Sequence, residues 1–188
     1  IYTNEYLNSL LSAWNIGIQA NIAGVLPLQR EFYNTNLRYS KERTVVIISD
    51  AMRYEVGQEL FSRMQDDPKC TAKLSVQLSV LPSYTRLGMA SLLPHKTLEM
   101  NDDFQVLVDG VLCDNLAGRE QVLQAYCPDS VCVQFDDIKN LKIADLRDLL
   151  TKRQIIYVYH NQIDARGDKA NTEDEVFNAC EEAVQEIM

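Results

Sequence analysis

Two unbroken apolar runs dominate the hydrophobic pattern of the chain. Val45 to Ile48 and Ile155 to Tyr159 lack polar alternation, which is typical of strands buried on both faces of a parallel sheet. Strands are therefore predicted at 44–49 and 154–159, with others at 73–81, 105–108 and 131–135. Apolar spacings of three and four predict helices at 54–64, 87–93, 116–126, 143–152 and 173–188. This alternation predicts an α/β fold with a mainly parallel sheet and helices on both faces.

Residues 1–40 have a different pattern. Leu7, Leu10, Leu11, Trp14 and Ile18 recur at spacings of three and four, which predicts an amphipathic helix with a break near 24–27. A second helical stretch is predicted at 28–39. We expect a helical N-terminal segment, 1–40, ahead of a core at 41–188. The segment either packs on or beside the sheet, or is a helix without its usual partner.

The segment from Glu99 to Gly110, within the connection between Pro94 and Leu116, is polar and is predicted to be irregular. Any lid or inserted element is expected there. Its Asp109-Gly110 pair is also the composition of an ordinary hairpin turn, and both interpretations stay open at this stage.

Candidate chemistry gathers where the predicted strands end, because ligands of open α/β sheets bind outside the carboxyl ends of the strands. Asp50 directly follows the first strand. Its alternative role is to cap a helix that begins near Met52, since Asp is a preferred N-cap. Thr85 follows the 73–81 segment and precedes a helix, where its hydroxyl is either a nucleophile activated by a neighbouring cation or another N-cap.

His160, Asp164 and Asp168 follow the strand at 154–159 within nine residues, with Gly167 allowing a tight turn between the acids. Together with Asp50 they form a candidate set of ligands for a divalent cation. The alternative is a polar surface loop, because Asp-x-x-Gly-Asp is a common turn composition. Arg53 and Arg86 flank the candidate residues and could hold phosphate oxygens, or simply be solvated.

Composition narrows the classes of function. The 188 residues, 46% hydrophobic, suffice for one sizeable core. A net charge of −9 disfavours a protein that coats nucleic acid, but not a phosphoesterase whose bound cation reverses the local charge. No run of transmembrane length and no secretory leader is visible, so no membrane partner is expected. Five cysteines without paired spacing suggest free thiols in a reducing cytoplasm.

From these residues the chain resembles the alkaline phosphatase superfamily and, within it, the PglZ proteins of BREX phage-defence systems. The motifs are Val46-Ile-Ile-Ser-Asp-Ala-Met-Arg53, Leu81-Pro-Ser-Tyr-Thr-Arg-Leu-Gly88 and Asp164-Ala-Arg-Gly-Asp168. The resemblance implies that Asp50 and Asp164 are metal ligands and that Thr85 is the nucleophile, itself close to the metal. Asp168 stands where the superfamily usually has a histidine. Asp168 would favour magnesium or manganese over the usual zinc, and His160 is an alternative source of nitrogen.

The resemblance covers residue 44 to the end and implies a truncated alkaline phosphatase-like core. Relatives carry a later strand ending in an Asp-His pair and a further histidine, whereas this chain contains only His95 and His160. We therefore expect the chain to fold but to be weakly active or inactive alone.

The function implied is that of a metal-dependent phosphomonoesterase or phosphodiesterase in phage resistance. Its expected partners are a phosphoester substrate, including a nucleotide or nucleic acid, and other phage-defence proteins. The alternative is a noncatalytic interaction module of a defence complex in which the metal site has degenerated.

Overall fold

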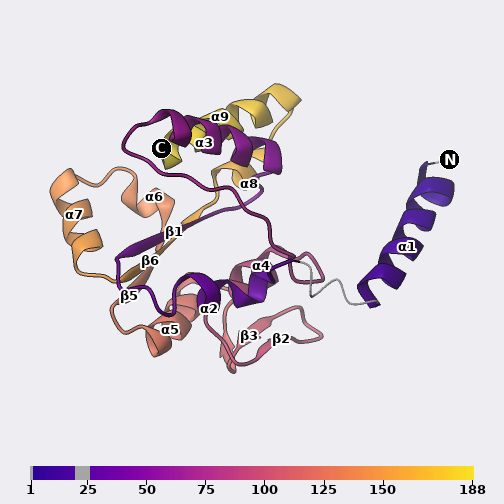
Figure 1. The fold of residues 1–188 in the computed structure, drawn as a ribbon, viewed down its shortest axis with the longest axis horizontal. Coiled ribbons are helices and arrows are strands. Elements are labelled where there is room, and N and C mark those ends of the chain that lie inside the picture. Colours follow the sequence, from indigo (N-terminus) through magenta and orange to yellow (C-terminus); the bar gives the residue numbers. More distant parts are fainter. Residues whose placement is uncertain (1, 20–25) are drawn as a thin grey trace.

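The protein, described here by a computed structural model that covers residues 2–19 and 26–188, contains two three-stranded sheets (Figure 1). The main sheet is parallel, with the order β1 (Thr44–Ser49), β6 (Ile155–His160), β5 (Ser130–Gln134). The smaller sheet is antiparallel, with the order β2 (Leu98–Met100), β3 (Val106–Val108), β4 (Val111–Leu112). The predicted α/β class with a parallel sheet is confirmed.

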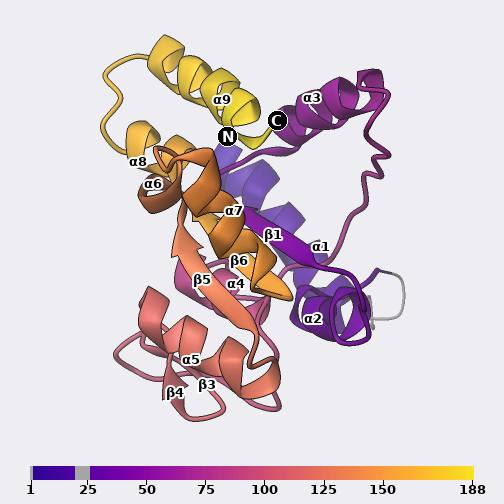
Figure 2. The same ribbon diagram turned by 90° about the vertical axis from the view of Figure 1, so that its left-hand side faces the viewer.

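Helices surround the main sheet, and α3 lies beside α9 in both views (Figures 1 and 2). Helix α4 packs on β2 and β3 of the small sheet, and η3 packs between α4 and α2. The helical elements are the π-helix η1 (Tyr2–Leu7), α1 (Asn8–Gln19), the 3₁₀ turn η3 (Gln29–Glu31), α2 (Phe32–Asn36), α3 (Tyr54–Asp66), α4 (Thr85–Ser91), α5 (Leu116–Tyr126), α6 (Phe135–Ile138), α7 (Ile143–Thr151), α8 (Gln162–Gly167) and α9 (Glu173–Ile187).

The central strand β6 is the most deeply buried element because it has a strand on each side. All six of its residues are buried. Tyr157 crosses the core and donates its hydroxyl hydrogen to the Leu92 carbonyl at 2.7 Å, which ties β6 to the end of α4. The edge strand β1 buries Val46 but leaves Val45 and Ile47 44% and 42% exposed. One face of β1 therefore remains partly open.

The N-terminal helix prediction is confirmed by α1, and the stretch at 28–39 is helical in η3 and α2. Gly24, in the predicted break, lies outside the described residues. Figure 1 shows α1 apart from the main sheet. Leu10, Leu11 and Trp14 stay about half-exposed, so the apolar face of α1 is not buried on the sheet.

The predicted strand at 73–81 is wrong. The segment is extended but forms one isolated bridge, between Leu28 and Leu78, and joins neither sheet. Its alternation is real, yet Val76 is 64% exposed because no neighbouring strand runs along the segment. A strand is defined by a partner as much as by its own pattern.

The predicted strand at 105–108 exists as β3, but in the antiparallel sheet inserted between α4 and α5. The inserted element is thus where it was expected. Asp109 and Gly110 form the two-residue hairpin turn between β3 and β4, with φ of 49° and 80° and Val108 paired to Val111. Asp and Gly tolerate this left-handed backbone better than other residues.

Replacing Asp109 by alanine is expected to destabilise the chain by about 2–4 kcal/mol. Its carboxylate accepts hydrogen bonds from the Lys96 and Thr97 amides and the Tyr126 hydroxyl at 2.8, 2.7 and 2.7 Å. The bond to Asp109 raises the pKa of Tyr126 to about 12. Urea unfolding of the chain measures the loss. The exposed Asp102→Ala variant is the control, and equal midpoints for both variants would contradict the anchoring role.

The five cysteines are all free, as expected. Cys113, Cys127 and Cys132 are buried, whereas Cys70 and Cys180 are partly exposed. Burial raises the pKa of the Cys132 thiol to about 12. None of the described helices has the length and apolar character needed to cross a membrane.

Candidate active site

Asp50 lies at the carboxyl end of β1, beside the end of β6. Its amide donates to the His160 carbonyl at 2.9 Å, which continues the ladder between the two parallel strands by one residue. The Asp50 carboxylate accepts the Ala51 amide at 3.0 Å, and Ala51 has φ of 60°. The alternative that Asp50 caps the next helix is wrong, because α3 begins at Tyr54 with Arg53 as its N-cap.

Asp164 lies in α8, which follows β6, and Asp168 is the C-cap of that helix, so the alternative interpretation of this segment as a polar surface loop is wrong. The Asp168 amide donates to the Asp164 carbonyl at 3.0 Å, so the two acids are one helical turn apart. Ile163 is buried and holds α8 against the rest of the fold. Asp164 is half-buried and Asp168 is exposed.

Asp164 and Asp168 act electrostatically on Asp50. Burial raises the pKa of the Asp50 carboxyl, the charge of Asp164 raises it further, and Asp168 adds a smaller increase. The Ala51 hydrogen bond and the charge of Arg119 lower it, without cancelling the rise. The negative charges of Asp164 and Asp168 oppose ionisation of Asp50. A bound cation would offset this repulsion between the carboxylates.

His160 is buried, and both of its ring nitrogens already have partners. Nδ1 lies 3.0 Å from Ser49 Oγ, and Nε2 lies 3.1 Å from a Glu186 carboxylate oxygen. The ring also meets Phe135 edge-on, with centroids 4.8 Å apart. Binding a metal through His160 would require one of these two hydrogen bonds to break, so its role as a ligand stays a prediction.

Thr85 is the first residue of α4 and is exposed. Its alternative role as the N-cap is wrong, because Tyr84 occupies that position and no side-chain cap bond forms. Helix α4 packs on β2, β3 and η3. Within the described part of the chain, no hydrogen bond joins Thr85 to Asp50, Asp164 or Asp168. The nucleophile assignment stays a prediction.

The two candidate arginines have different surroundings. Arg86 pairs with Asp114 at 3.4 Å, and Asp114 also accepts the Val106 amide at 3.1 Å, which links the start of α4 to the inserted sheet. Arg53 is exposed, and together with Asp164 and Asp168 it lines a groove between α3, α8 and α9. Arg53 is therefore the cation nearer to the candidate acids along this groove.

That groove, between α3, α8 and α9, has a volume of about 770 Å³. Apolar side chains of Val56, Ile163 and Phe177 line it, and its rim is acidic. The acidic lining residues are Glu55, Glu59, Asp164, Asp168, Glu173 and Glu181. The groove is therefore suited to a positively charged ligand, or to a ligand that binds together with a cation.

Arg119 was not singled out from the sequence. It is 6% exposed, its Nε donates to the Cys113 carbonyl at 3.0 Å, and its guanidinium lies 4.8 Å from the Tyr159 ring centroid. The sequence did hold a signal, because Arg119 lies three and four residues before buried Val122 and Leu123 on the predicted helix. Arg119 is a buried positive charge whose field reaches Asp50.

The donor set fits a hard divalent cation in its chemistry, because carboxylate oxygens suit magnesium or manganese. The charge of Asp164 is close enough to Asp50 to raise the pKa of its carboxyl, and a bound cation would offset this repulsion. Among the described residues, however, no group of three or more His, Cys, Asp or Glu side chains is arranged to hold a metal ion. Asp50, Asp164 and Asp168 therefore do not form a complete metal-binding site in the described part of the chain.

The parallel main sheet with Asp50 at its carboxyl edge is consistent with an alkaline phosphatase-like domain, and the comparison with protein families shows that class. The chain belongs to the family of the BREX system PglZ alkaline phosphatase-like domain, whose model matches residues 29–188. The family resemblance predicted from the strand-end motifs is confirmed.

Two curated relatives match the whole chain. It is 38% identical over 196 residues to the alkaline phosphatase-like protein PglZ of Bacillus cereus (strain H3081.97). It is 40% identical over 202 residues to the alkaline phosphatase-like protein BrxZ of Escherichia coli O9:H4 (strain HS). The chain spans 23% of the length of each relative. No solved structure matches it.

Proposed function

We propose that the chain supplies part of the active site of a metal-dependent phosphohydrolase, either a phosphomonoesterase or a phosphodiesterase, that acts in bacterial phage resistance. The observation that carries the proposal is the placement of Asp50 at the end of β1 and of Asp164 on α8, the helix that follows the adjacent parallel strand β6, close enough for the charge of Asp164 to raise the pKa of Asp50. Membership of the PglZ family supports the phosphatase-like class and the defence setting.

Asp50 and Asp164 would hold a divalent cation, with Asp168, His160 and Thr85 as further candidate ligands. Zinc is the usual ion of the superfamily, and the oxygen-rich donor set also suits magnesium or manganese. Such an ion would stabilise negative charge that develops on the phosphoryl oxygens.

Thr85 would attack the phosphoester. Its Oγ forms a bond to phosphorus, the bond between phosphorus and the leaving alcohol oxygen breaks, and the hydroxyl proton passes to solvent or a nearby base. Water then hydrolyses the phosphothreonine and restores the hydroxyl. Arg53, on the groove, would hold phosphate oxygens. Arg86 would do so only after release from Asp114.

A second candidate function is a noncatalytic module that docks other phage-defence proteins. Two observations favour it: Asp168 occupies the position of the expected histidine, and the described residues form no complete metal cage. For either function the free cysteines suit a reducing cytoplasm.

Metal binding distinguishes the two functions. In the full-length protein, Asp164→Asn is expected to weaken Mn²⁺ or Zn²⁺ binding at least about tenfold, because a charged ligand becomes neutral. Titration calorimetry measures this change. Asp174→Asn, an exposed acid in the first turn of α9, is the matched control. Equal affinity in wild type and Asp164→Asn would remove Asp164 from the ligand set, and absence of metal binding by the wild type would favour the docking module.

A further inference from the structure

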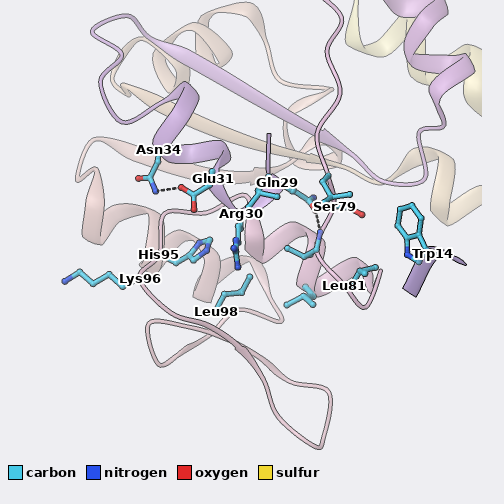
Figure 3. A pocket seen from close by; sticks show the side chains of 14 residues that line it. Trp14, Gln29, Arg30, Glu31, Asn34, Ser79, Leu81, His95, Lys96 and Leu98 are labelled. Carbon is cyan, nitrogen blue, oxygen red and sulfur yellow. Dashed lines mark hydrogen bonds between the residues drawn. The ribbon is translucent and has the colours of Figure 1, made fainter. Parts of the chain in front are cut away.

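A second pocket, of about 720 Å³, lies outside the acidic groove and shares no residue with it (Figure 3). Its walls come from η3, from the extended segment at 78–81, and from the connection between α4 and β2. The volume falls within the range of small-molecule sites, roughly 300–1,000 Å³. This pocket has no part in the phosphohydrolase proposed above.

Gln29 fixes the walls of this pocket. Its backbone amide donates to the Leu78 carbonyl at 2.9 Å, while its side-chain oxygen accepts the Val80 amide at 3.1 Å. Its side-chain nitrogen donates to the Gly88 carbonyl of α4 at 3.3 Å. One residue thus joins η3, the extended segment and α4, so the pocket is held by hydrogen bonds in addition to packing.

The charge of the pocket is opposite to that of the chain as a whole. Arg30, His95 and Lys96 line it in a protein of net charge −9. Within residues 2–19 and 26–188, neither Arg30 nor Lys96 forms an ion pair. The acidic lining residue, Glu31, accepts a hydrogen bond from the Asn34 side-chain amide at 3.2 Å. Both cations therefore keep their charge available to an anion, and the Lys96 side chain, which points away from Arg30 in Figure 3, would have to turn to share one with it.

His95 adds a directed polar atom. Its Nδ1 lies 2.7 Å from the Leu93 carbonyl, which can only accept, so Nδ1 carries the hydrogen. Nε2 is the other polar atom of the ring and is available to a ligand. The Arg30 guanidinium beside His95 suits a phosphate group, because it presents planar N–H donors that match phosphate oxygens.

Most of the remaining lining is apolar or aromatic. Leu28, Leu87 and Leu98 form apolar surface, and Trp14 of α1 lies at the side opposite Lys96 (Figure 3). Trp14 is 45% exposed. An aromatic face of this kind is a platform for stacking a nucleobase.

We infer that this pocket binds a nucleotide, with its phosphate on Arg30 and Lys96 and its base toward Trp14. Inorganic phosphate would leave the aromatic and leucine surface unused, and an uncharged nucleoside would leave two cations without a partner. The inference does not depend on the proposed phosphohydrolase activity, because no acid of the candidate active site lines this pocket.

The test uses Trp14, the single tryptophan of the sequence, as the reporter. The 188-residue chain is titrated with AMP in EDTA, so that metal-dependent hydrolysis cannot consume the ligand, and tryptophan fluorescence and binding heat are both recorded. We expect a saturable signal with AMP and at least about tenfold weaker binding of adenosine and of inorganic phosphate.

Arg30→Gln is expected to weaken AMP binding at least about tenfold, because a charged donor pair is lost. The exposed Arg38→Gln, whose guanidinium lies over Tyr39, is the matched control and should bind like the wild type. Asp50→Asn should also retain AMP affinity, which separates this pocket from the candidate active site. If Arg30→Gln fails to fold, Lys96→Gln carries the same test.

Absence of both fluorescence change and binding heat with AMP would overturn the inference. If Arg30→Gln binds AMP as tightly as the wild type does, the placement of the phosphate on Arg30 and Lys96 is wrong. The same conclusion follows for Lys96→Gln if Arg30→Gln does not fold. Inorganic phosphate as tight as AMP would overturn the nucleotide class, and adenosine as tight as AMP would overturn the role of the cations.

Discussion

Replacing Thr85 by alanine is expected to lower the turnover of a chromogenic phosphodiester by the full-length protein at least about 10³-fold, because the covalent route requires the hydroxyl. The fold should not suffer. Thr85 is exposed, and the helix cap position belongs to Tyr84, so the methyl and hydroxyl groups of Thr85 stabilise little. Initial rates with added zinc or manganese, together with the thermal midpoint of unfolding, measure the two effects.

Two variants bracket the Thr85 result. Ser83→Ala removes an exposed hydroxyl two residues earlier and is expected to keep full turnover. Thr85→Ser keeps a hydroxyl at the same atom and is expected to retain much of it. Equal turnover in wild type and Thr85→Ala would remove Thr85 as the nucleophile, even if metal binding at Asp164 were demonstrated.

Gly118→Ala is expected to destabilise the chain by about 2–4 kcal/mol. A Cβ at Gly118 would lie 1.9 Å from the Leu112 carbonyl oxygen and 3.0 Å from its carbon. These are backbone atoms of β4, so α5 and the inserted sheet would have to move apart. Urea unfolding gives the change in the free energy of unfolding.

The matched control for this substitution is Gly57→Ala in α3. Gly57 is also helical, but nothing lies within 4 Å of its added Cβ. Alanine there should be neutral or stabilising by about 0.4–1 kcal/mol, because it restricts the unfolded chain and favours the helix. A loss at Gly57 equal to that at Gly118 would show that the close approach of α5 to β4 is not the cause.

The sequence predicts the elements whose burial is decided locally. The apolar runs predict both β1 and β6, although only β6 is buried on both faces, because β1 has a neighbouring strand on one side alone in the described residues. The predicted helix at 116–126 has the observed bounds of α5. The segment at 73–81 failed because its alternation specifies an extended backbone but not a partner strand. The α8 helix was not predicted, because the Asp-x-x-Gly-Asp composition is typical of a turn and the sequence does not show that Ile163 is buried.

The candidate site divides in the same way. Asp50 and the acids of α8 could be placed near one another from sequence, because the ends of adjacent parallel strands meet. The two hydrogen bonds of the His160 ring could not be predicted from the sequence, because one of the partners, Glu186, lies at the C-terminal end of α9. The position of Thr85 relative to the acids depended on the 73–81 segment entering the sheet, which it does not.

The unshared side of β1 has a geometric implication for catalysis. In the described residues β1 pairs with β6 alone, and its other row of amides and carbonyls faces away from the sheet. A further parallel strand hydrogen-bonded along that row would end level with Asp50, and its last side chains would arrive beside the carboxylate. Any strand added along this edge of β1 would therefore place its last residues next to Asp50 in a fixed register.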